Sequence, residues 1–401
     1  MTTSTQRLVP LLLILATFVF EMSTDIYIPC LPEMTRHFGV EDSVLQMTLS
    51  SYLLGYALLG CLSGPLSDSL GRRAIFLSGA AIFLIGSLGC WFSFSVLFLI
   101  ISRFIQGTGV GICVVITNAI IKDSFDEKNC SRILSTIWMI IAISPMIAPI
   151  YGAAIGAAYG WHANFTLVAT CASIVAIVMT ACLPETLPPE QRSVFQSKEI
   201  IKTYLILLTR LRIIGYALIS ALVFGGLWTW LTVAPFYIIN ELGIKSTDYG
   251  YYSAIGPFAF IIGTIFNQRL VGRLGVDVML RWGLLTTIIG AFLLVMVALI
   301  FPYSIFMIYG ALAIYGAGMA PVFSSAVTKA LDVPPHQRGA AAALLNTIEL
   351  AMASLSAFVV SLFSNTTLLP ATLIMLGCIV GCCGILYRIQ GRLVTSEQKA
   401  G

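Results

Sequence analysis

The chain has 401 residues, of which 58% are apolar and only 10% are charged. Water-soluble domains usually carry about 25% charged residues, so most of the surface of this protein is expected to face lipid. The net charge of +4 comes mainly from short loops. It therefore indicates membrane topology and not a nucleic-acid partner.

Twelve apolar runs follow one another along the chain, each close to the ~20 residues that a helix needs to cross ~30 Å of hydrocarbon. The runs cover approximately residues 8–30, 45–66, 74–94, 96–120, 132–157, 162–183, 212–238, 250–271, 279–301, 303–327, 340–363 and 368–390. Gly and Pro interrupt many of them and none alternates with period two, which favours helices over a β-barrel. We predict an all-α polytopic membrane protein with twelve transmembrane helices. A cleaved signal peptide is the alternative for the first run, but no small-residue cleavage site follows it.

The longest polar segment lies between the sixth and seventh runs. It predicts an N-terminal six-helix bundle over residues 1–183, a cytoplasmic linker over 184–211 and a C-terminal six-helix bundle over 212–401. Two halves of equal span number suggest an internal repeat with a pathway near the bilayer midplane. A single bundle with one long loop is the alternative.

Lys and Arg are strongly biased to alternate loops. Of the 22 basic residues, all but Arg36, Arg103 and Lys245 fall on one side of the predicted topology. Basic loops stay in the cytoplasm, so both termini are predicted to be cytoplasmic.

The sequence gives little support for disulfides, metal centres or nucleotide-binding sites. The ten cysteines lie mostly inside spans, so no disulfide framework is expected. Cys382 and Cys383 are adjacent and no His-rich cluster accompanies them, so we expect no metal centre. No G-x-x-x-x-G-K-[ST] motif occurs, which disfavours direct ATP hydrolysis. We expect no cofactor.

Two acidic residues of the first span, Glu21 and Asp25, are four residues apart and hence on one helix face. A charge at the centre of a membrane helix costs about 2.5–3.5 kcal/mol on insertion scales. Two ionised carboxylates ~6 Å apart repel by roughly 3 kcal/mol at an effective dielectric near 20, so one should hold a proton. We predict a coupled pair that loads a proton outside and releases it inside. The alternatives are that Asp25 pins a broken helix end near Pro29 and that Glu21 bonds to a neighbouring helix.

Arg103 and Glu349 are further charges inside spans. Arg103 cannot lose its proton, so it needs carbonyls or a carboxylate, and we predict that it tunes the carboxylate pair. A structural tie between helices is the alternative. Glu349 suggests a cationic or amine-bearing substrate if it faces the pathway, and nothing if it is a packing residue.

The fifth and seventh spans carry residues typical of packing seams and ligand sites. Small and Pro residues in the fifth span predict a bend and close packing, and so a hinge or seal; they are Pro145, Pro149, Gly152 and Gly156. In the seventh, Phe224 and Trp228 are predicted to line the substrate cavity, with an interfacial aromatic belt as the alternative.

The segment GPLSDSLGRR, from Gly64 to Arg73, joins the second and third spans. Gly64 and Pro65 permit a tight turn, and Asp68 can cap the next helix or pair with a basic group. Arg72 and Arg73 are expected to hold the loop in the cytoplasm.

This segment, together with twelve spans, resembles the charged turn of the major facilitator superfamily. STDIYIPCLP, QMTLSSYLLGYA and LPETLPPEQR look like the Bcr/CflA branch of drug:proton antiporters. SRFIQGTGVG is similar to the superfamily motif that carries an intramembrane Arg, and SPMIAPIYGAAIG resembles its antiporter motif. The resemblance implies the two-bundle fold, alternating access and proton-coupled export. It also implies that the charged turn takes part in gating, through Gly64, Asp68, Gly71, Arg72 and Arg73. Tyr52 and Gln106, which stand in these motifs, are expected in the substrate cavity.

We therefore expect a proton-coupled exporter of drug-like or amphipathic small molecules in the bacterial inner membrane, working as a monomer. Its partners would be substrate, protons and the lipid bilayer. A dedicated exporter of one metabolite, such as a siderophore, sugar or amino acid, is the second hypothesis. The third is a non-transporting sensor or scaffold, which would gain nothing from the insertion cost of the buried charges.

Overall fold

The computed structural model describes the backbone of residues 3–192, 197–334 and 337–400, and the side chains of 9–192, 198, 201–334 and 337–390. Within these ranges the chain forms helices and their connections, and no strand. Twelve segments are long and apolar enough to cross a membrane, and each overlaps one predicted apolar run. This confirms the predicted all-α polytopic fold with twelve spans.

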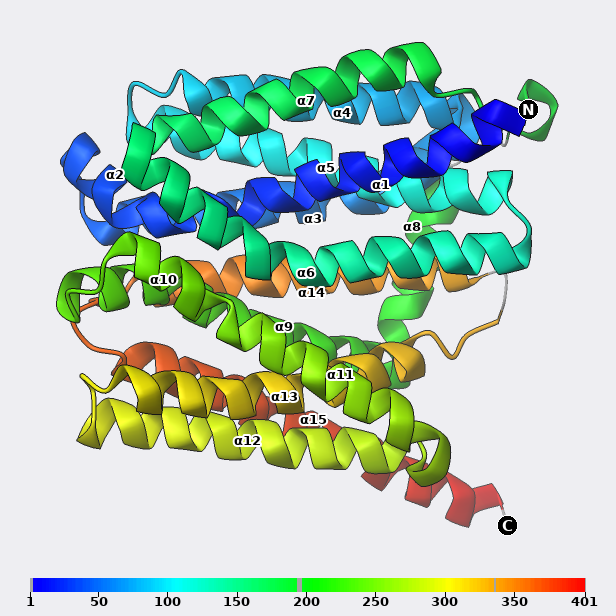
Figure 1. The fold of residues 1–401 in the computed structure, drawn as a ribbon. Coiled ribbons are helices and arrows are strands. Elements are labelled where there is room, and N and C mark those ends of the chain that lie inside the picture. Colours follow the sequence, from blue (N-terminus) through cyan, green and yellow to red (C-terminus); the bar gives the residue numbers. More distant parts are fainter. Residues whose placement is uncertain (1–2, 193–196, 335–336, 401) are drawn as a thin grey trace. The chain divides into compact units, whose positions relative to one another are not determined.

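The chain folds as two compact units (Figure 1). The first comprises Met1–Ser197 and Ile238–Ala254, and the second comprises Lys198–Tyr237 and Ile255–Gly401. The connection between the seventh and eighth spans thus belongs to the first unit, and the second unit begins inside the predicted linker. The assignment of residues 1–183, 184–211 and 212–401 to two bundles and a linker stays a prediction.

The helices of the first unit are α1 (Thr3–Asp25), η1 (Ile28–Cys30), α2 (Leu31–Phe38), α3 (Asp42–Leu70), α4 (Arg72–Trp91), α5 (Val96–Ser124), α6 (Glu127–Tyr159), α7 (His162–Cys182), η2 (Pro189–Gln191) and α10 (Ser246–Ser253). The π-helical turn η3 (Tyr237–Glu241) straddles the boundary between the units. The second unit contains α8 (Ser197–Thr209), α9 (Leu211–Phe236), α11 (Ile255–Leu274), α12 (Val276–Ile300), α13 (Ile305–Ala330), α14 (Arg338–Ser361) and α15 (Leu369–Ala400).

Glycines allow the spans of each unit to pack closely. A Cβ on Gly107 of α5 would collide with the carbonyl of Tyr52 in α3, and one on Gly55 would collide with the carbonyl of Phe104. In the second unit, a Cβ on Gly263 of α11 would collide with the carbonyl of Ala317 in α13. Small residues are enriched at membrane helix contacts because lipid supplies little hydrophobic drive for association.

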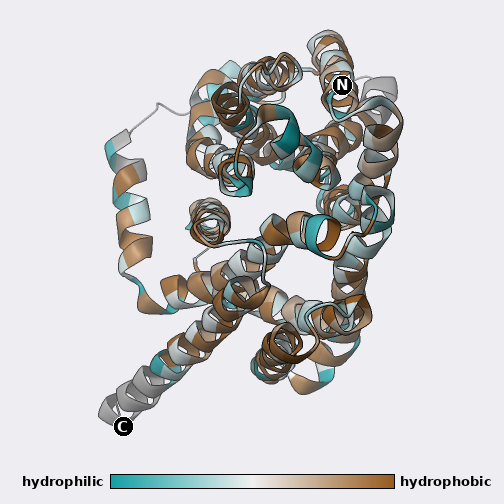
Figure 2. Ribbon diagram, turned by 90° about the vertical axis from the view of Figure 1, so that its left-hand side faces the viewer, coloured by the Kyte–Doolittle hydropathy of each residue, from teal (hydrophilic) through white to brown (hydrophobic). Residues whose placement is uncertain are grey.

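Apolar residues occupy most helical positions (Figure 2), and many large apolar side chains are exposed. Exposed aromatic side chains gather at the α4–α5, α6–α7 and α12–α13 connections; they include Phe92, Phe94, Tyr159, Tyr303 and Phe306. Aromatic rings are typical of membrane–water interfaces. These connections therefore mark the interfacial ends of the spans.

Candidate functional site

The first span breaks at its acidic end. Helix α1 stops at Asp25, and the chain continues through η1 and α2, each with a Pro in its first two positions. Proline lacks an amide hydrogen and disfavours the helical conformation in the residue before it, so Pro29 and Pro32 prevent one continuous helix. A carboxylate at a helix C-terminus adds to the negative end of the helix dipole and cannot cap it. The helix break therefore accounts for the position of Asp25 at a helix end, but helix capping does not account for an acidic residue there.

Asp25 lies in a buried electrostatic cluster. Its side chain is only 5% exposed, and it interacts electrostatically with Glu21 and Arg103. Tyr249 of α10, itself buried, also interacts with it. Glu21 is partly exposed and accepts a hydrogen bond from the hydroxyl of Tyr56 at 3.4 Å. The structure thus brings together the two acids and the arginine that the sequence singled out.

Arg103 of α5 is held mainly by uncharged groups. Its side chain is fully buried, and its Nη1 donates to the Ser23 carbonyl at 3.0 Å and to Oε1 of Gln106 at 2.5 Å. Its Cζ lies 4.4 Å from the ring centroid of Tyr27 and 4.1 Å from that of Tyr52. Of the predicted alternatives, the structure favours carbonyls over a carboxylate, because no ion pair within 4 Å joins Arg103 to an acid in the described part of the chain.

Hydrogen bonds fix the two tyrosines against the guanidinium. The Thr24 hydroxyl donates to the hydroxyl of Tyr52 at 2.9 Å, and the hydroxyls of Tyr27 and Thr48 lie 3.0 Å apart. Gln106 donates from Nε2 to the Ser87 hydroxyl at 2.9 Å. Both Tyr52 and Gln106, predicted for the substrate cavity, are fully buried beside Arg103. That either one touches substrate stays a prediction.

Two donors of Arg103, Nε and Nη2, are buried without a hydrogen-bond partner among the described residues. An unsatisfied buried donor on a charged group costs several kcal/mol in a low-dielectric interior, or less where aromatic faces replace the missing contacts. Asp25 is the acid of α1 that interacts electrostatically with this guanidinium. These two buried donors are therefore available to a further acceptor.

Helix α6 packs directly against the broken end of α1. A Cβ on Gly152 would collide with the carbonyl of Ile26, and one on Gly156 with the sulfur of Cys30. Asn164 of α7 donates to the Gly152 carbonyl at 3.0 Å. Pro145 and Pro149 lie inside α6. The predicted close packing of the fifth span is therefore present, next to Asp25, while its role as a hinge stays a prediction.

The charged turn between α3 and α4 is organised by Arg72. Its guanidinium contacts Asp68 at 2.5 Å and Asp123 of α5 at 2.8 Å, and Asp68 thus pairs with a basic group as predicted. The backbone N–H of Arg72 donates to Glu185 at 3.0 Å. Arg73 donates to the Thr180 carbonyl at 2.7 Å. This network joins four membrane spans and the segment after α7 at one end of the first unit.

One detail of the predicted turn is wrong. Gly64 and Pro65 lie inside α3, which continues to Leu70, and the turn is made at Gly71 with φ +103°. Membrane helices tolerate an internal Pro, because neighbouring groups satisfy the freed carbonyl. A Cβ on Gly71 would also collide with Glu185. Both the positive φ and the close contact require glycine at this position.

Asp123 and Glu185 are members of this network that sequence reasoning did not single out. Asp123 follows Lys122 at the end of the fourth span, and Glu185 stands in the LPETLPPEQR segment that carried part of the family resemblance. Glu185 accepts hydrogen bonds from the N–H groups of Thr186 and Leu187, at 3.0 and 3.1 Å. The sequence feature that could have predicted the role of Glu185 is its place beside the proline-rich turn.

The second unit holds its own buried acid. Glu349 of α14 is 7% exposed, is hydrogen-bonded to Ser220 of α9, and has one oxygen without a partner among the described residues. Ser220, Phe224 and Trp228 recur at four-residue intervals and so share one face of α9. Trp228 is buried with its indole N–H unpaired in the described structure. Its ring lies 6.3 Å from that of Phe224. Burial favours an interior role for Trp228 over the interfacial belt.

Comparisons with known proteins establish the family. The family model described as Major Facilitator Superfamily matches residues 13–357, so the chain is a multi-pass membrane transporter and not an enzyme. It belongs to the Major Facilitator Superfamily. The chain is 28% identical over 361 residues to a bicyclomycin resistance protein homolog of Haemophilus influenzae, covering 89% of each chain. It is 26% identical over 349 residues to the multidrug resistance protein MdtM of Escherichia coli, covering 86% of this chain and 84% of the relative. These relatives agree with the Bcr/CflA resemblance.

Solved structures show the same fold. The xylose transporter XylE from E. coli aligns with a TM-score of 0.74 and 16% identity, over 96% of this chain and 98% of that one. A bacterial homolog of the lysosomal transporter Spinster aligns equally well, with a TM-score of 0.74 and 16% identity over 96% of both chains. The predicted superfamily fold is confirmed.

Two variants of Tyr52 test whether its aromatic ring, and not only its hydroxyl, stabilises the guanidinium of Arg103. Tyr52→Phe keeps the ring under the guanidinium, whereas Tyr52→Leu removes it. We expect Tyr52→Leu to lower the free energy of unfolding by about 1–2 kcal/mol more than Tyr52→Phe, the range of a desolvated cation–π contact with its packing. Denaturant unfolding of the purified protein in detergent measures the difference. Equal losses in the two variants would mean that the ring does not stabilise Arg103.

Proposed function

We propose that this transporter exports drug-like or amphipathic small molecules across the bacterial inner membrane in exchange for protons, by alternating access. The observation that carries the proposal is the burial of Asp25 beside Glu21 and a fully buried Arg103. The resistance and multidrug names of the relatives support the substrate class. The proposed arrangement is a monomer in the bilayer with both termini in the cytoplasm, as the bias of basic loops indicates.

The coupling follows from the charge on Asp25. Asp25 and Arg103 interact electrostatically, and neighbouring opposite charges attract by roughly a few kcal/mol at an effective dielectric near 20. Ionised Asp25 therefore draws the guanidinium of Arg103 toward α1, and protonation releases it to the carbonyl and tyrosine contacts described above. A ligand with different affinity for these two arrangements exchanges with the proton. Glu21, one turn earlier and hydrogen-bonded to Tyr56, supplies the second member of a coupled pair.

Neutralising Asp25 tests this scheme. In everted vesicles, Asp25→Asn should reduce proton-coupled efflux to the level of vesicles without the transporter, because the side chain can no longer bind and release a proton. Asp248→Asn is the matched control, since Asp248 is an exposed acid of the same unit, and it should transport normally. Wild-type efflux by a correctly inserted Asp25→Asn variant would remove Asp25 from the mechanism.

Substrate breadth separates multidrug export from the alternative of a dedicated metabolite exporter. Proton movement would be followed in the same vesicles as cationic and neutral amphiphiles are added one at a time. Responses to many unrelated compounds support multidrug export. A response to a single metabolite replaces it with the narrower function.

Glu349 is proposed to recognise cationic substrates. It is a buried acid with an unpaired oxygen, and its partner Ser220 lies on the helix face that carries Phe224 and Trp228. Aromatic faces and a carboxylate together suit a lipophilic cation.

Glu349→Gln should raise the half-saturating concentration of tetraphenylphosphonium roughly tenfold, the effect of losing ~1.4 kcal/mol, and leave a neutral compound such as chloramphenicol unchanged. Transport assays with both compounds measure the contrast. Ser220→Ala is the control, because it removes the hydroxyl partner and keeps the carboxylate. Equal losses for cation and neutral compound in Glu349→Gln would show that Glu349 is structural.

A further inference from the structure

Helix α8 directly precedes a candidate membrane span. It ends at Thr209, and the candidate span that includes α9 begins at Leu211, so a single residue, Arg210, separates the two helices. One residue spans at most ~3.6 Å. In both ribbon views α8 runs across the direction of α12 and α13 of its own unit (Figures 1 and 2). This arrangement is the one expected of a helix that lies along a membrane surface.

The inner face of α8 is anchored to its own unit. Leu207 is fully buried in a cluster with Ile213 of α9, Val333 of the α13–α14 connection and Ala341 of α14, and Tyr204 packs against the same cluster. Beside it, Arg212 pairs with Asp332 at 3.0 Å. These contacts hold α8 in place and leave its opposite face uncovered by its own unit.

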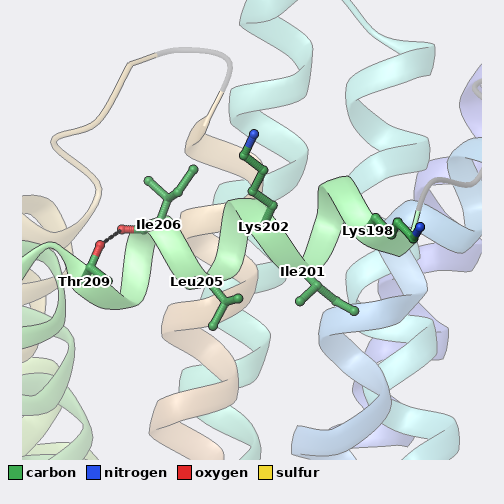
Figure 3. A pocket seen from close by; sticks show the side chains of 6 residues that line it. All are labelled: Lys198, Ile201, Lys202, Leu205, Ile206 and Thr209. Carbon is green, nitrogen blue, oxygen red and sulfur yellow. Dashed lines mark hydrogen bonds between the residues drawn. The ribbon is translucent and has the colours of Figure 1, made fainter.

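The outer face of α8 is apolar and basic. Ile201, Leu205 and Leu208 recur with helical spacing and are 57%, 57% and 46% exposed. Lys198 and Lys202 flank this strip, and Figure 3 shows Lys202 projecting away from Ile201 and Leu205. The lysines and apolar side chains line an open hollow of about 400 Å³ along the helix. An apolar strip bordered by lysines is the pattern of helices that lie in a lipid headgroup region.

We propose that α8 docks onto anionic phospholipid of the adjacent membrane leaflet, with Ile201, Leu205 and Leu208 in the acyl boundary and Lys198 and Lys202 on lipid phosphates. We favour lipid as the binding partner of this face because a candidate span begins directly after Arg210. An apolar strip beside the start of a span meets headgroups and acyl chains. Arg210 adds a third exposed basic side chain. No described acidic side chain pairs with Lys198 or Lys202; the side chain of Glu199 lies outside the described residues.

Hydrogen–deuterium exchange of the full-length protein in nanodiscs tests the proposal. We expect the amides of α8 to exchange more slowly in phosphatidylcholine discs that contain phosphatidylglycerol than in phosphatidylcholine alone, by up to roughly thirtyfold for two lysines at an anionic surface. Lys198→Gln with Lys202→Gln should abolish this difference. Lys198→Arg with Lys202→Arg, which keeps both charges, should retain it. Ile201→Ser with Leu205→Ser should weaken protection in both lipids.

Three results would overturn the proposal: equal exchange of α8 in the two lipids, a lipid effect that survives in the double Gln variant, or the same protection from inorganic phosphate in detergent micelles. Protection that depends on protein concentration would instead assign the strip to a second copy of the chain. The readout needs no transport, so its failure is distinct from failure of the proposed exchange mechanism.

Discussion

The contact on which this account depends is the stacking of the Arg103 guanidinium between Tyr27 and Tyr52. Arginine stays charged in any protein interior. A fully buried Arg103 therefore needs protein groups that stabilise its charge. Two aromatic faces, one carbonyl and one amide oxygen supply them without a neutralising acid. Because those partners come from α1, α3 and α5, the charge ties three spans of the first unit together. It also leaves two donors of the guanidinium without a partner among the described residues, close to the buried Asp25.

The packing around the broken end of the first span is tight. The break after Asp25 is set by Pro29 and Pro32, and Gly152 of α6 lies against the backbone just beyond it. Close-packed interiors have low compressibility and transmit strain. At one end of the same unit, Arg72 joins Asp68 of α3, Asp123 of α5 and Glu185 in one network. Charge in the span and charge at its end are therefore linked through the same two helices.

The sequence predicted the spans because hydrocarbon thickness imposes their length, and it predicted Glu21, Asp25, Arg103 and Glu349 because intramembrane charges are costly. It could not predict the tyrosine sandwich or the Ser220–Glu349 contact, since these join residues far apart in the chain. Gly64 and Pro65 were assigned to a turn because both residues are typical of turns. Membrane helices tolerate an internal Pro, so α3 continues through Gly64 and Pro65 and ends at Leu70, before Gly71 with its positive φ.

Proton release on ligand binding is the most direct measure of whether the buried acids are coupled to substrate. The purified transporter would be mixed with tetraphenylphosphonium in weakly buffered detergent solution, and the released protons followed with a pH-sensitive dye. The account requires release from the wild-type protein and none from Asp25→Asn, with binding of the cation still detectable in both. Equal release from the two proteins would contradict it, because the exchanged proton would then reside elsewhere.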